Sequence, residues 1–387
     1  MNNIDTHFSI DDYLIPLLPH LPSGLFAAQA LSNIRSIARQ IPGLASSFFG
    51  FESPLGIVDA RADFLLCFKP TESGREILSG HHDSLHLPNQ YFTTPAWQRV
   101  KAFSETWADP NSSLYNKVEN TWLEFDIAEN QPAIPLPSFF FGTYSAIQAK
   151  MPPHQHQWVT GGALKILLNN TLPIDTQRQL LTCFNALPDG AYVFQVGTML
   201  ARETDAVRIC IRGIAPEQVV PYLLEVGWSG SAEELKELVE RLSGLVDRVD
   251  LDLDVGATVY PKIGLECYLN MQPKFEPRWA RFLNGLVEKG LCVPEKQKAL
   301  LAYPGYNHER MNTDVWPKQL LTMSTLLGAH YLSMIIRSIH HIKIVYQPEA
   351  PLQAKAYLAV THSFLDTASL KTLDMRTLPK PTQPPSQ

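Results

Sequence analysis

Apolar residues along the chain follow two periods, and segments of the two kinds alternate. The first period is helical: in Ser231–Val246 the leucines and valines recur at every third or fourth position, which places them on one face of a helix. Ser231 and Glu234 have the spacing of a capping box at its start, and Gly290 suits the left-handed position after a second helix. The same period predicts helices over Asp11–Arg39, Pro95–Trp107, Ser231–Val246 and Pro277–Lys289.

Between these helices, extended segments occur in pairs. Their residues alternate between apolar and polar types, and a short turn-like segment such as Arg202–Asp205 joins the two partners, as in a β-hairpin. An open sheet of ten antiparallel strands would leave two unpaired edges, and closing the sheet into a barrel removes both. The five predicted pairs are Ser46–Phe51 with Ile57–Lys69, Thr121–Ile127 with Ser138–Tyr144, Ala191–Leu200 with Ala206–Gly213, Val249–Thr258 with Lys262–Leu269, and His340–Tyr346 with Gln353–Val360.

The predicted fold is therefore α/β (α+β): a closed barrel of about ten antiparallel strands in repeated α-β-β-α units, with helices outside and a polar lumen. The length of 387 residues is sufficient for such a barrel. We expect an N-terminal helical segment over residues 1–44, a single barrel domain over 45–365 and a C-terminal tail over 366–387. The tail ends in the proline-rich run Leu378–Gln387, which predicts disorder there.

Each predicted strand has one apolar and one polar face. In Val249–Val255, for example, leucines and valines alternate with three aspartates. On an open sheet the polar face would be exposed to solvent, whereas in a closed barrel it would line the lumen. The residues assigned to this face are Trp122, Glu124, Asp126, Arg208, Cys210, Arg212, Asp250, Asp252, Asp254, Glu266, Tyr268, His341, Lys343, Lys355 and Tyr357.

The composition is that of a folded protein, with 45% hydrophobic and 18% charged residues. Because 32 Lys and Arg residues face 38 Asp and Glu residues, the net charge is −6, and no overall positive field would attract nucleic acid or an anionic membrane. The first residues lack the pattern of a secretory signal, and no run of about 18 apolar residues predicts a membrane span. Five separated cysteines without a C-x-x-C pair favour reduced thiols, so we expect a cytoplasmic protein.

The succession of α-β-β-α units that closes into a ten-stranded antiparallel barrel resembles the ABBA, or PT-barrel, prenyltransferases. The resemblance is one of architecture and covers about residues 45–365. It implies a transferase that moves an isoprenoid group from its diphosphate to an aromatic or peptide acceptor inside the lumen, in the biosynthesis of natural products.

In that family, Lys, Arg and Tyr side chains at alternate strand positions bind the donor diphosphate. The family also places a carboxylate near the acceptor, for which Glu124 and Glu266 are the candidates here. The residues that the resemblance implies for donor binding are Arg208 and Arg212 in R-x-x-x-R, Lys343, and Lys355 with Tyr357 in K-x-Y.

These residue types suit the chemistry of prenyl transfer. Fixed cations stabilise the negative charge that develops on the leaving diphosphate. Trp122, Tyr268 and Tyr357 would shield the allylic cation from water, and a carboxylate would accept the proton that the acceptor loses. Asp252 and Asp254 lie on the same predicted face and are suitable ligands for Mg²⁺, which we therefore consider as a cofactor.

Two other functions fit the same polar face. One is a non-catalytic module that binds a peptide or a small molecule and assists a biosynthetic pathway. The other is a metal enzyme centred on Asp250, Asp252 and Asp254. The basic residues discriminate between the prenyltransferase and the binding module. Catalysis requires the two arginines and two lysines named above to converge on one site of diphosphate size, whereas a peptide binder can scatter them.

Overall fold

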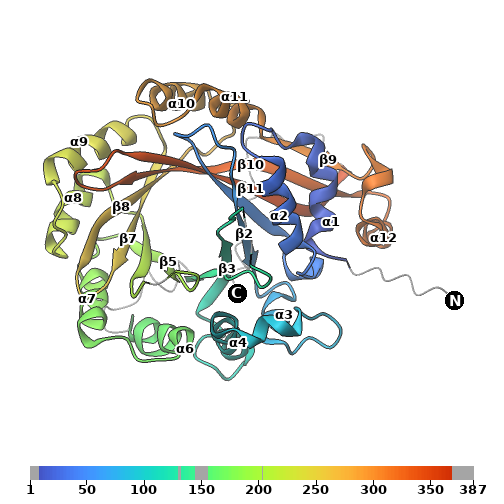
Figure 1. Ribbon diagram of the computed structural model, residues 1–387, viewed down its shortest axis with the longest axis horizontal. Helices are drawn as coiled ribbons and strands as arrows, with labels where there is room; N and C mark the ends of the chain where they lie inside the picture. The colour runs from blue at the N-terminus through green and yellow to red at the C-terminus, as the bar shows by residue number, and fades with distance from the viewer. Residues whose placement is uncertain (1–7, 130–131, 144–155, 203, 368–387) are drawn as a thin grey trace.

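The computed structural model describes residues 8–129, 132–143, 156–202 and 204–367 (Figure 1). Ten strands form a closed antiparallel ring, in which β1 to β8 follow one another, β10 pairs with β8, and β11 pairs with both β10 and β1. This closure confirms the predicted barrel. The strands are β1 (Phe48–Pro54), β2 (Asp63–Phe68), β3 (Val118–Phe125), β4 (Ser138–Thr143), β5 (Tyr192–Thr198), β6 (Val207–Arg212), β7 (Arg248–Val255), β8 (Val259–Tyr268), β10 (Tyr331–Tyr346) and β11 (Gln353–Asp366), with a short strand β9 (Gly305–His308) that pairs with the first half of β10.

Helices surround the barrel on its outside (Figure 1). The α-helices are α1 (Ile10–Leu14), α2 (Ala28–Ala38), α3 (Gly74–Ser79), α4 (Pro95–Ala108), α6 (Leu164–Leu168), α7 (Ile174–Asn185), α8 (Pro216–Glu225), α9 (Ala232–Ser243), α10 (Arg278–Glu288), α11 (Pro294–Ala302) and α12 (Lys318–Leu327). Short 3-10 helices cover Ile15–His20, Gly43–Ala45, Asn89–Thr93 and Thr313–Val315, and a π-helix covers Trp158–Ala163.

The hydrophobic core lies between the helices and the outer face of the barrel. In β7, Leu251 and Leu253 are fully buried there, and Leu235 of α9 and Trp279 of α10 belong to the same core. The aspartates that alternate with the leucines of β7 point into the lumen. This arrangement confirms the two strand faces that the period of two predicts.

The helix predicted from Ser231 is present as α9, with part of its predicted cap. Ser231 Oγ accepts the backbone N–H of Glu234 at 3.4 Å. The carboxylate of Glu234 does not return to Ser231 as a capping box requires; it accepts a hydrogen bond from the hydroxyl of Tyr346 at 2.7 Å. This bond connects α9 to the end of β10.

The single helix predicted over Asp11–Arg39 is wrong. The chain forms α1, then the 3-10 helix Ile15–His20, and begins a new helix only at Ala28. Pro16, Pro19 and Pro22 explain the interruption, because proline has no backbone N–H to donate and its ring clashes with the preceding turn of an α-helix.

The strand predicted to begin at His340 begins at Tyr331, so β10 is more than twice as long as expected. A β-bulge between Ile339 and His341 leaves His340 without a partner on β11. Because one extra residue reverses the alternation of faces, both His340 and His341 contact the lumen-facing ring of Tyr268.

The described part of the chain contains no helix that is long and apolar enough to span a membrane. All five cysteines are free and buried. Most of the predicted tail, residues 368–387, lies outside the described residues, as does Tyr144 at the end of one predicted strand.

Candidate functional site

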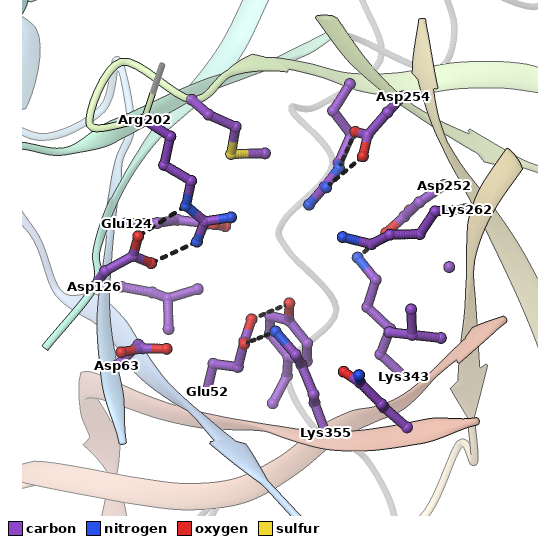
Figure 2. Close-up of a pocket in the computed structure, with 17 residues that line it drawn as sticks. Glu52, Asp63, Glu124, Asp126, Arg202, Asp252, Asp254, Lys262, Lys343 and Lys355 are labelled. Atoms are coloured by element: carbon purple, nitrogen blue, oxygen red, sulfur yellow. Dashed lines mark hydrogen bonds and ion pairs between the residues drawn. The ribbon is translucent and has the colours of Figure 1, made fainter. Parts of the chain in front are cut away.

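A cavity lies at the end of the lumen where the β-hairpin turns are, and we call it the mouth cavity (Figure 2). Charged residue types dominate its lining. The six carboxyl groups are Glu52, Asp63, Glu124, Asp126, Asp252 and Asp254, and the five cations are Arg202, Arg208, Lys262, Lys343 and Lys355. The other lining residues are Leu65, Met199, Gly264, Val345, Gln353 and Tyr357.

One wall of the mouth cavity comes from β6, β7, β8 and β10. Arg208 and Asp254 are neighbours in register on β6 and β7, and the Nε and Nη2 groups of Arg208 donate to the two carboxylate oxygens at 2.8 and 3.0 Å. Burial alone would raise the pKa of Asp254, but this bidentate pairing lowers it below its usual value. The arginine fork is therefore held in one orientation by its own carboxylate.

Lys343 of β10 reaches over Gly264 of β8 and forms an ion pair with Asp252 of β7. A Cβ atom at Gly264 would lie 2.5 Å from Cε of Lys343 and 2.9 Å from Oδ2 of Asp252, so glycine leaves the space in which the pair forms. Burial alone would lower the pKa of Lys343, but the charge of Asp252 raises it overall. Lys343 is therefore a fixed cation at neutral pH.

The floor of the mouth cavity holds the predicted K-x-Y residues. Nζ of Lys355 donates to Glu52 Oε1 at 2.5 Å, and the hydroxyl of Tyr357 donates to the other oxygen of Glu52. Burial would raise the pKa of Glu52, but Lys355 and these hydrogen bonds lower it to about 2. Glu52 thus stays ionised and orients both residues toward the cavity.

The opposite wall, from β2 and β3, is acidic. Arg202, in the turn after β5, donates to both oxygens of Asp126 at 2.7 and 2.8 Å, and this pair is about half exposed. Glu124 has no hydrogen-bond partner among the described residues, and burial followed by the charge of Glu52 raises its pKa to about 8. Burial and Glu52 likewise raise the pKa of Asp63 to about 6, although its Oδ1 accepts the Ile127 N–H at 2.8 Å.

Below the mouth cavity, side chains fill the middle of the lumen. His341 stacks on Tyr357 with 4.2 Å between ring centroids, and its Nε2 lies 3.5 Å from Glu266. The hydroxyl of Tyr268 donates to the same carboxylate at 2.6 Å. Trp122 packs edge-on against Phe48, with ring centroids 5.1 Å apart.

The structure divides the predicted site residues between these regions. Glu266, Tyr268 and Trp122 lie deeper in the lumen, and Arg212 lies farther along it, beside Asp250. The predicted residues that line the mouth cavity are Glu124, Arg208, Asp252, Asp254, Lys343, Lys355 and Tyr357.

Four charged residues that line the mouth cavity are not among the site residues predicted from the sequence. They are Glu52, Asp63, Arg202 and Lys262. The alternation of β1 would have placed Glu52 on the polar face, opposite Phe51. Arg202 lies in a turn, where no period indicates the direction of a side chain. Its role at the rim depends on the tertiary contact with Asp126.

The predicted Mg²⁺ ligands Asp252 and Asp254 both line the mouth cavity, and both carboxylates are engaged by cations. Within the described ranges, no three His, Cys, Asp or Glu side chains are arranged to hold a metal ion. However, Oδ1 of Asp252 is buried without a hydrogen-bond partner. One such oxygen fits a Mg²⁺ that is bound mainly by substrate phosphates, as this ion often is. Because Asp250 lies with Arg212, the three aspartates of β7 do not form one centre.

No protein-family model and no curated protein sequence match the chain. Among solved structures, 6-dimethylallyl tryptophan synthase superposes with a TM-score of 0.50 over 92% of this chain and 96% of that one, at 12% identity. The chain has the barrel fold of the ABBA-type prenyltransferases. At this identity, the comparison establishes the fold of the PT barrel, and the function must be argued from the site.

Two other similar structures are enzymes of the same kind. 5-dimethylallyl tryptophan synthase from Streptomyces coelicolor, in complex with DMASPP and Trp, has a TM-score of 0.49 and 11% identity, covering 98% of this chain and 99% of that one. Prenyltransferase PriB has a TM-score of 0.47 and 12% identity, covering 90% and 94%.

Proposed function

We propose that this PT-barrel protein is a prenyltransferase, which moves an isoprenoid group from its diphosphate to an aromatic or peptide acceptor at the mouth cavity. The observation that supports this most is the convergence of Arg208, Lys343 and Lys355, together with Lys262 and Arg202, on one cavity. Such convergence is expected for catalysis and not for a peptide binder. Three of the four basic residues named from the sequence take part in it.

The cations would hold the donor diphosphate and stabilise the charge that develops as it leaves. Lys262 is available first, because it has no hydrogen bond or ion pair among the described residues. Its side chain is exposed, and partial desolvation together with the charge of Arg208 lowers its pKa. Arg208, Lys343 and Lys355 would exchange a carboxylate partner for a phosphate oxygen. A diphosphate is sufficiently charged for this exchange, whereas a single carboxylate ligand would gain little.

The isoprenoid chain would lie against the few apolar side chains of the cavity. Leu65, Met199 and Val345 line it, and the ring of Tyr357 lies at its floor. An aromatic face beside an allylic cation stabilises the cation and excludes water from it. Trp122 and Tyr268, which we also predicted for this role, lie deeper and would contact only a chain that displaces the side chains above them.

Glu124 is the proposed base of the transfer step. After the acceptor attacks C1 of the isoprenoid and the C–O bond to diphosphate breaks, the acceptor must lose a proton. A carboxylate whose pKa is raised to about 8 is a stronger base than an ordinary glutamate, and Glu124 lines the cavity without a cation partner among the described residues. Glu266, the other predicted base, is held by Tyr268 below the cavity.

Mg²⁺ remains part of the proposal. Asp252 Oδ1 and the diphosphate oxygens would hold it, and the ion would supply additional positive charge to the leaving group. The cytoplasmic location and the lack of a nucleic-acid partner, both expected from the sequence, stay predictions.

The second candidate function is a non-catalytic binding module, and the charge balance of the mouth cavity favours it. Six carboxyl groups face five cations, so the charges nearly balance and a neutral or zwitterionic peptide would meet little net charge. A module of this kind would bind peptide without binding an isoprenoid diphosphate.

Calorimetric titration with dimethylallyl, geranyl and farnesyl diphosphate, with and without Mg²⁺, distinguishes the two functions. Binding of one donor at about micromolar concentration supports the transferase and justifies a screen of aromatic and peptide acceptors. The variant Asp252→Asn/Lys343→Gln removes both charges of one pair and is the matched control, because it should fold and bind donor poorly. Failure of all three donors to bind the wild-type protein would reject the transferase and favour the binding module.

A further inference from the structure

Arg212 and Arg248 lie at the end of the lumen opposite the mouth cavity, and there they share one carboxylate. Nε of Arg212 donates to Asp250 Oδ2 at 2.8 Å, and Nε of Arg248 donates to Oδ1 at 2.9 Å. Asp250 is fully buried, whereas the two arginine side chains are 30% and 37% exposed. We call these two residues the arginine pair. Two cations on one carboxylate leave one positive charge without a counterion in the group.

Aromatic rings hold both guanidinium groups in place. Cζ of Arg248 lies 4.0 Å from the ring centroid of Tyr268, and Cζ of Arg212 lies 4.1 Å from that of Phe194. Stacking on an aromatic face fixes the plane of a guanidinium group and leaves its edge free for hydrogen bonds. The arginine pair is therefore ordered in the absence of a ligand.

The hydrogen bonds of the arginine pair use only the two Nε atoms. Within the described residues, neither guanidinium has another hydrogen bond, so the Nη groups of both are available. Arg208 in the mouth cavity differs, because its Nε and Nη2 groups both bind Asp254. An anion can thus bind the arginine pair without displacing a carboxylate, and two adjacent forks match the oxygens of a carboxylate or phosphate.

Titratable side chains from β3, β8 and β10 lie near the arginine pair. His340 of β10 lies near the pair and is exposed at this end of the lumen, but desolvation by the surrounding protein lowers its pKa to about 4, so it is neutral at pH 7. Glu119 of β3 interacts with Arg212: burial raises the pKa of the Glu119 carboxyl group, and the charge of Arg212 partly opposes this rise. Glu266 is held by Tyr268.

We propose that the arginine pair is a second anion-binding site, which takes the carboxylate or phosphate group of a small molecule independently of the mouth cavity. The proposal goes beyond the transfer reaction and does not depend on it. It also gives a role to Arg212, which the sequence associates with the donor diphosphate and the structure separates from the other cations.

Calorimetric titration with inorganic phosphate and with benzoate tests the proposal in wild-type protein and in Asp252→Asn/Lys343→Gln, which weakens the mouth cavity only. We expect a site with a dissociation constant on the order of 1 mM or lower in both proteins. Arg212→Gln and Arg248→Gln should each weaken it about tenfold, with circular dichroism showing that both variants are folded. Tighter binding of phosphate than of benzoate indicates a phosphate ligand, and the reverse order indicates a carboxylate.

Asp250→Asn is the decisive variant, because it has nearly the same shape and removes the shared negative charge, together with one of the two acceptors for the Nε groups. If the arginine pair serves an anion, this variant should bind the anion several times more tightly than the wild type. If the two arginines exist only to neutralise Asp250, neither the wild type nor Asp250→Asn will show the site, and the proposal is overturned. Donor binding at the mouth cavity, measured separately, is unaffected by either outcome.

Discussion

The two ends of the lumen handle positive charge in opposite ways. In the mouth cavity, Arg208, Lys343 and Lys355 each have a carboxylate partner, and a bound anion must compete with that partner. At the other end, Arg212 and Arg248 share Asp250 and keep their Nη groups available. The same residue types therefore produce a site that only a strongly charged ligand can enter and a site that a weakly charged one can enter.

The difference shows that a count of cations does not identify an anion site. What matters is how many hydrogen bonds each cation has already made and what a ligand must displace. For the mouth cavity, a multiply charged group such as a diphosphate satisfies this condition. The raised pKa of Glu124, caused first by burial, helps further, because a carboxyl group that is largely protonated at neutral pH repels the ligand little.

The largest effect is expected from a change that damages both ends together. Leu253→Asp places a charge between β7 and the helices, where the leucine is fully buried. The uncompensated charge should cost more than about 4 kcal/mol and leave little folded protein, as measured by circular dichroism and thermal unfolding. Asp252→Asn, one position away on the lumen face, is the control and should fold. A stable Leu253→Asp protein would mean that the strand faces are assigned wrongly.

The next largest effect is expected on donor binding, and it should distinguish the two ends of the lumen. Lys343→Ala and Lys355→Ala should each weaken donor binding by more than about a hundredfold, because a cation is lost and an unpaired carboxylate is left to repel the diphosphate. Arg212→Gln should leave the donor affinity within about twofold. Calorimetry with the donor measures all three variants. Unchanged affinity in both lysine variants would refute the mouth cavity as the donor site.

The sequence predicts which side chains enter the lumen but not which of them meet. Alternation along a strand is local, and it placed Arg208, Lys343 and Lys355 on the correct face. The pair Lys343 and Asp252 is separated by 91 positions, and Lys355 and Glu52 by 303, so these contacts depend on the register of strands around the closed barrel. The bulge beside His341 has no sequence signature in one chain, and it moves His340 into the lumen as well.

A third prediction concerns the acidic wall of the mouth cavity. As a base, Glu124 must be deprotonated, so the transfer rate should rise with pH and level off above its pKa of about 8. Glu124→Gln should lower the rate about a hundredfold and remove this rise, because no carboxyl group titrates there. Single-turnover rates measured between about pH 6 and about pH 9 report both effects. Superimposable profiles for the two proteins would exclude Glu124 as the base.

The smallest effect is expected from Gly264→Ala. The added methyl group would overlap the space that Lys343 uses to reach Asp252, and the atoms nearest to it belong to these two residues and not to the arginine pair. We expect donor affinity to fall about tenfold while phosphate binding to the arginine pair stays constant, both measured by calorimetry. A loss at both sites would mean that the two ends are coupled.

The most direct test is a crystal structure of the protein with dimethylallyl thiolodiphosphate, an analogue of the donor that reacts slowly. We expect the diphosphate to lie in the mouth cavity, within hydrogen-bond distance of Arg208, Lys262 and Lys343, and at least one carboxylate partner to have moved away. A diphosphate bound to Arg212 and Arg248, with the ion pairs of the mouth cavity intact, would contradict the assignment of the mouth cavity as the donor site.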